Sequence, residues 1–164
     1  MVDWFFENLE RTVILINKVF VFIASLMMSG LVIIVCSDIF LRYFLRSPLV
    51  WSTEVTEILL LDITFLGTAW VFKENGHVVI DVFTSKANER KRKILNFISY
   101  VLIAIVCWVL IYYGFSTTYE HYVGGVYNPT AIETPISLIT VVIPLGSIPL
   151  FLEVFLKGRK LFKK

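Results

Sequence analysis

The fold is decided by residues 19–41, VFVFIASLMMSGLVIIVCSDIFL. The first charged residue of this stretch is Asp38, so the positions before it form a long run without any charge. A helix needs about 20 consecutive, predominantly apolar residues to cross the hydrocarbon core of a bilayer. The stretch therefore predicts a membrane-spanning helix.

Three further stretches have a similar length and apolar character, and they occupy residues 50–72, 94–115 and 135–155. Of the 164 residues in the chain, 57% are hydrophobic, which exceeds the roughly 45–50% of a soluble domain. We therefore expect an all-α membrane protein: a single integral membrane domain over residues 1–164 with four transmembrane helices.

Lys and Arg residues are sorted between the two sides of the expected membrane. Of the 15, only Arg42 and Arg46 lie between the first and second spans, and none lies between the third and fourth. Because cytoplasmic connections are enriched in Lys and Arg, both termini are predicted to be cytoplasmic. The basic clusters would meet anionic lipid headgroups. A net charge of +2 is too small to suggest nucleic acid as a partner.

Residues 1–18 show an amphipathic pattern, with apolar residues at helical spacing and acids between them. Two interpretations are open: a short amphipathic helix in the cytoplasmic interface with Trp4 as its membrane anchor, or an extension of the first span. Trp51 and Trp70 stand near the two ends of the second span, where an aromatic belt is expected.

Charged side chains gather where the first span ends and the second begins. The short connection makes these spans antiparallel neighbours, and a charge at mid-bilayer costs about 2.5–3.5 kcal/mol on insertion scales. We expect one compact network that holds this hairpin together or joins it to a partner helix; its members are Asp38, Arg42, Glu54 and Glu57. A proton or ion relay and simple exposure at the interface are the alternatives.

Asp62 lies near the middle of the second span, far in the sequence from any Lys or Arg. Contact with a polar group on another chain, an ion site and a tolerated polar residue all remain open. We expect the first and second spans to carry charged residues and the third and fourth spans to carry none. The two halves of the chain would then be unlike. Pro144 and Pro149 are expected to kink the fourth span, which neighbouring helices tolerate.

Patterns typical of catalysis or cofactor binding do not occur in the sequence. His77 and His121 both lie outside the spans, which argues against haem bound within the membrane. Gly-rich phosphate loops and Cys-x-x-Cys pairs are missing as well. We therefore expect no catalytic residue, no metal and no cofactor.

Three local motifs follow one another in a specific order. They are Phe40-Leu-Arg-Tyr-Phe44, Trp51-Ser-Thr-Glu54 and Gly76-His-Val-Val-Ile-Asp81. Together with the chain length and the four spans, they make nearly the whole chain resemble the small membrane (Q) subunit of a tripartite ATP-independent periplasmic (TRAP) transporter.

The resemblance implies a protein that is not an enzyme and that resides in the bacterial inner (cytoplasmic) membrane. It implies a large multi-span permease (M) subunit as partner, which would carry the sodium and substrate sites and move like an elevator against this chain as a scaffold. It also implies a periplasmic substrate-binding protein (P) and uptake of an organic acid, of the sialic acid or C4-dicarboxylate class.

Under this resemblance, the aromatic residues after the third span have two interpretations. Tyr119, Tyr122 and Tyr127 either help to dock the periplasmic protein or form an aromatic belt at the lipid boundary. Two other classes of protein stay open for the chain as a whole. One is a small proton-coupled transporter that works alone, with Glu54 or Asp62 as its proton site, and the other is a non-catalytic membrane subunit of a redox complex.

Overall fold

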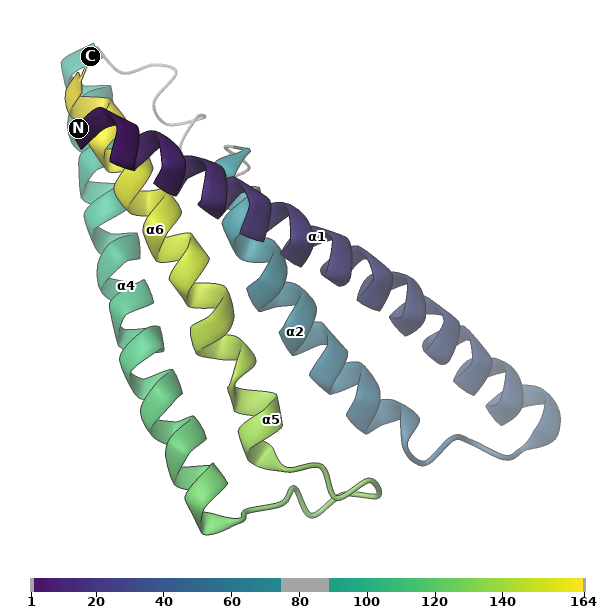
Figure 1. The fold of residues 1–164 in the computed structure, drawn as a ribbon. Coiled ribbons are helices and arrows are strands. Elements are labelled where there is room, and N and C mark those ends of the chain that lie inside the picture. The colour runs from purple at the N-terminus through teal and green to yellow at the C-terminus, as the bar shows by residue number, and fades with distance from the viewer. Residues whose placement is uncertain (1, 75–88, 164) are drawn as a thin grey trace.

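The computed structural model describes residues 2–74 and 89–163, and these are almost entirely helical (Figure 1). The elements are α1 (Val2–Phe40), a short π-helix (Leu41–Leu45), α2 (Ser52–Lys73), α4 (Glu89–Gly124), α5 (Ile136–Thr140) and α6 (Val142–Lys163). Four helical segments are long and apolar enough to cross a membrane. This confirms the predicted all-α membrane protein with four transmembrane helices. The Gly76–Asp81 motif and His77 lie outside the described residues.

The N-terminal segment does not form a separate helix. It is the beginning of α1, which runs without a break from Val2 to Phe40. The sequence explains this continuity, because the first Gly or Pro in the chain is Gly30. Of the two arrangements left open, the structure therefore has the extension of the first span. With 39 residues, α1 is about 58 Å long, almost twice the thickness of the hydrocarbon core.

The four long helices form one layer instead of a closed bundle (Figure 1). Their order across the layer is α4, α6, α2 and α1, and α1 also contacts α6. Both chain termini lie at one end, where α1, α4 and α6 converge, and we call it the terminal end. The helices spread apart toward the other end, which holds the α1–α2 and α4–α5 connections and which we call the hairpin end.

The centre of the layer is α6. In the most apolar stretch of the span that α5 and α6 form, 39% of the residues are buried, against 6% in the corresponding stretches of α1 and α4. Two glycines permit the close approach of its neighbours. A Cβ atom on Gly146 would lie 2.5 Å from the carbonyl oxygen of Phe65 in α2, and one on Gly114 of α4 would lie 2.9 Å from Cδ of Pro144.

The fourth span is interrupted at Val141, between α5 and α6. Pro144 explains the break, because it has no N–H to donate to the carbonyl of Thr140, and its ring would clash with that carbonyl in a continuous helix. The interruption occurs where Pro144 predicted a kink. Pro149 is accommodated inside α6.

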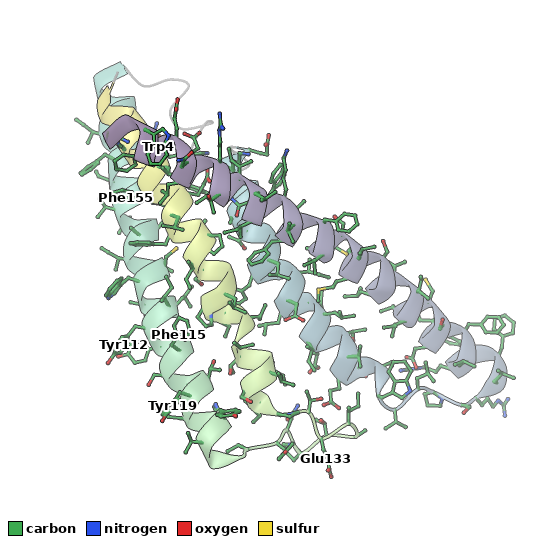
Figure 2. All side chains as sticks on the ribbon, in the orientation of Figure 1. Trp4, Tyr112, Phe115, Tyr119, Glu133 and Phe155 are labelled. Atoms are coloured by element: carbon green, nitrogen blue, oxygen red, sulfur yellow. The ribbon has the colours of Figure 1, made fainter. Side chains whose placement is uncertain are left out.

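A small apolar core forms where α1, α2 and α6 meet, around Ala24, Leu66 and Val142. Most other large apolar side chains are exposed along the helices, as the sticks in Figure 2 show. Because a soluble protein rarely exposes so much contiguous apolar surface, these faces must be covered by lipid or by another membrane protein.

Candidate polar contacts at the two ends of the helix layer

Asp38 organises the connection between α1 and α2. Its Oδ2 accepts a hydrogen bond from Nη2 of Arg42 at 2.7 Å, and its Oδ1 accepts one from the backbone N–H of Leu49 at 2.8 Å. The π-helix between these residues ends at Leu45, and the residue that follows it, Arg46, has a φ of 52° in the left-handed region. One carboxylate thus joins the end of α1 to the segment that leads into α2.

Glu54 is buried in the first turn of α2 and binds the connection between α4 and α5. Its Oε2 accepts a hydrogen bond from the backbone N–H of Ile132 at 3.2 Å, and its Oε1 accepts one from the Thr134 hydroxyl at 3.1 Å. Backbone bonds close this loop, among them one from Asn128 N–H to Thr134 C=O at 2.9 Å. Glu54 therefore joins the two halves of the chain at the hairpin end.

The expected four-residue network is divided in the structure. Arg42 and Asp38 form the expected ion pair, but Glu54 binds a different segment. Glu57 is exposed, and no hydrogen bond or ion pair joins it to any of those three side chains. Glu54 is buried against the α4–α5 connection, whereas Glu57, about 60° further around the helix, is exposed on the side of α2 that its neighbours leave open. Whether these residues serve a partner stays a prediction.

Asp62 is half-buried in the middle of α2. Within residues 2–74 and 89–163, no side chain or backbone group forms a hydrogen bond or an ion pair with its carboxylate. The three interpretations of Asp62 therefore remain open as predictions.

A further polar contact, which the sequence reasoning missed, joins α1 to α6 near the terminal end. Nδ2 of Asn17 lies 3.5 Å from Oε2 of Glu153, and both side chains are buried. The amide oxygen of Asn17 has no hydrogen-bond partner among the described residues. Placing charged residues only in the first two spans was wrong, because Glu153 lies within residues 135–155. The available signal was an acid in an apolar stretch, four residues before Lys157.

Lys157 of α6 binds the last turn of α2. Its Nζ donates hydrogen bonds to the carbonyl oxygens of Phe72 at 2.6 Å and Lys73 at 2.9 Å. A cation near a helix C-terminus can bind the last carbonyls of the helix and interacts favourably with the helix dipole. On the same helix, the Arg159 guanidinium lies 3.5 Å from the centre of the Phe6 ring in α1. α6 therefore binds both α1 and α2 at the terminal end.

The aromatic residues expected to dock a protein or to line the lipid boundary are exposed near the hairpin end. Tyr119 and Tyr122 lie in the last turns of α4, Tyr127 follows in the loop, and each is more than half exposed. Figure 2 shows Tyr112 and Tyr119 along α4. A groove of about 450 Å³ follows this helix between Trp108 and Tyr119. Docking and an aromatic belt both stay predictions for these residues.

The tryptophans expected to act as membrane anchors lie near the two ends of the layer. Trp4 and Trp51 are exposed, at the start of α1 and just before α2. Trp70 is partly buried near the end of α2, and Nζ of Lys73 lies 4.8 Å from its ring centre. In the part of the chain that the structure describes, no three His, Cys, Asp or Glu side chains cluster as metal ligands.

Known proteins resemble this chain over most of its length. At 28% identity, 62% of the chain matches the sialic acid TRAP transporter permease protein SiaT of Haemophilus influenzae, of which it covers 17%. At 29% identity, 58% of the chain matches 60% of a putative TRAP transporter small permease protein from the same species. At 26% identity, 69% of the chain matches 76% of the sialic acid TRAP transporter small permease protein SiaQ of Vibrio cholerae.

The match to a protein family is broader than the match to any of these relatives. Residues 31–161 match the family described as "Tripartite ATP-independent periplasmic transporters, DctQ component". This range includes α2, α5, most of α6, and the Asp38 and Glu54 contacts. The chain therefore belongs to the DctQ component family of TRAP transporters, and it is a transporter subunit and not an enzyme.

Proposed function

We propose that this chain is the small scaffold subunit of a sodium-driven, binding-protein-dependent secondary transporter in the bacterial inner membrane. Its partners would be a large permease subunit and a periplasmic substrate-binding protein. The transported substrate would be an organic acid of the sialic acid or C4-dicarboxylate class. The basic segments at the terminal end would lie on the cytoplasmic side.

The observation that carries the scaffold role is the construction of the layer. Four helices stand side by side, and polar side chains join them at both ends: Glu54 at the hairpin end, and Glu153 with Lys157 toward the terminal end. A layer joined in this way resists sliding of its helices, while its broad apolar faces stay available for a partner. That is what a fixed support for a moving permease requires.

The relatives support the choice of partner and substrate class. SiaT is named a permease protein, and a segment similar to this chain makes up only 17% of it. In that protein a small-subunit segment and a much longer segment therefore belong to one polypeptide. Two of the three relatives are named for sialic acid, which supports an acidic sugar or a similar carboxylate as the substrate.

The proposal is tested by reconstituting the chain in liposomes with and without a large TRAP permease and its binding protein. We expect the chain to co-purify with the permease, and uptake of sialic acid or of a C4-dicarboxylate to require all three proteins and an inward sodium gradient. Uptake by this chain alone, driven by a proton gradient, would show an autonomous transporter instead. Failure to co-purify would remove the scaffold role.

A further inference from the structure

All exposed residues of α2 lie on one face of the helix. They are Thr53, Glu57, Leu60, Thr64 and Val71. Their spacings of four, three, four and seven residues keep them in line on an α-helix. Gly67 fills the remaining position of this line, and a Cβ atom there would meet no other atom within 4 Å. We call these six residues the Glu57 face; α1 and α6 cover the rest of α2 at least partly.

Within the apolar stretches, the Glu57 face is set apart by its carboxylate; small polar residues are not unique to it, because α1 also exposes Ser25 and Ser29. The exposed sides of α1 and α4 carry large apolar residues such as Phe22, Leu102 and Ile105, which suit lipid. The Glu57 face carries a carboxylate, two threonines and a glycine. Small residues and hydroxyls are typical of surfaces where membrane helices pack against each other, because they let two backbones approach closely.

The polar groups of this face differ in whether their own chain satisfies them. The Thr64 hydroxyl donates to the carbonyl of Leu60 at 2.7 Å, so it needs no further partner. Glu57, in contrast, forms no hydrogen bond or ion pair within residues 2–74 and 89–163. A carboxylate that faces lipid is costly, and its charge calls for a cation or a hydrogen-bond donor at the same depth.

We propose that the Glu57 face is the surface on which a transmembrane helix of the large permease packs, with a Lys, Arg or hydroxyl donor opposite Glu57 and its closest backbone approach at Gly67. This inference rests on the proposed function and names the part of the chain that would carry it. The partner helix would pack directly against α2, on the side that α1 and α6 leave open.

The test is photo-crosslinking within the complex of this chain and the large permease. A benzophenone-bearing phenylalanine replaces Leu60 or Thr64 on the Glu57 face, and replaces Ile105 on the exposed side of α4 as the control. We expect adducts with the permease from both α2 positions, in several-fold higher yield than from Ile105. Equal or lower yields from α2, or adducts between two copies of this chain, would overturn the proposal.

A second arm tests the charge. Glu57→Lys should weaken association with the permease by about threefold or more, the effect of an average interhelical hydrogen bond in a membrane, and Glu57→Gln should weaken it less. The thermal midpoint of the isolated chain should not change in either variant. Unchanged association in Glu57→Lys would contradict the assignment.

The two proposals fail differently. If the unmodified chain does not co-purify with the permease, the proposed function itself is wrong. If it co-purifies but the adducts map away from α2, only the Glu57 face is wrongly assigned. Gly67→Leu, compared with Gly30→Leu on α1, provides a matched pair because neither glycine has an atom near its missing Cβ. Equal loss of complex in both variants would count against the Glu57 face.

Discussion

Gly146 and Phe65 set the spacing between α6 and α2. A Cβ atom on Gly146 would lie 2.5 Å from the carbonyl oxygen of Phe65 and 2.7 Å from its carbonyl carbon. Real Cβ atoms do not approach backbone atoms so closely, so the two helices meet here without any side chain from α6 between them. Further along α6, Glu153 lies next to Asn17 of α1, and Lys157 binds the last turn of α2.

The first prediction concerns this contact. Gly146→Ala forces α2 and α6 apart and should destabilise the chain by about 1–3 kcal/mol, as overpacking of a tight core does. The thermal unfolding midpoint in detergent measures the effect. Gly30→Ala is the matched control, because its Cβ enters open space and alanine favours a helix. A midpoint for Gly146→Ala at or above that of Gly30→Ala would contradict the close approach.

A second prediction addresses the turn between α1 and α2. Asp38→Ala removes the acceptor for both Leu49 N–H and Arg42. We expect faster exchange of the Leu49 amide hydrogen and faster proteolysis between residues 46 and 51. Asp38→Asn keeps an oxygen acceptor and should show a smaller change. Equal protection in the alanine variant and the wild type would mean that Asp38 does not organise the turn.

Glu54 gives a third prediction, at the loop between α4 and α5. Glu54→Ala leaves the Ile132 N–H and the Thr134 hydroxyl without their acceptor. Hydrogen exchange of the loop amides should therefore accelerate at Ile132. Glu57→Ala is the control, since Glu57 has no bond to this loop. The idea that Glu54 joins the two halves of the chain fails if both variants exchange alike.

The fourth prediction tests the contact of α6 with the end of α2. Lys157→Met keeps the apolar stem but removes both hydrogen bonds to the Phe72 and Lys73 carbonyls, a loss on the order of 1–3 kcal/mol. A lower thermal midpoint is expected. Lys73→Met should have a smaller effect, because the Lys73 ammonium lies over the Trp70 ring at the end of the same helix. The reverse order would contradict this assignment.

A fifth prediction separates docking from an aromatic belt at the hairpin end. Tyr122→Ala and Tyr127→Ala together should lower the uptake that depends on the binding protein, while co-purification with the large permease stays unchanged. The measurement is uptake by reconstituted liposomes at several concentrations of the binding protein. Uptake equal to that of the wild type would favour the aromatic belt.

Sequence reasoning predicted the elements better than the contacts between them. Four spans follow from local runs of apolar residues, and α2 begins and ends within two residues of the predicted 50–72. The grouping of Glu54 with Asp38 assumed that residues at similar depth meet. It failed because Glu54 faces a loop that lies about 80 residues later in the chain. Asn17 and Glu153 were missed for the same reason.

The sequence by itself determined the class of protein: a run of about 20 apolar residues is enough to place a helix in a membrane, whatever its neighbours are. Only the tertiary structure decided that the helices form one layer with α6 between α4 and α2. That order depends on where two backbones approach closely, at Gly146 and Gly114, and on which distant carbonyl or carboxylate each polar side chain then reaches. Such pairings arise from packing across the whole chain, and no local pattern contains them.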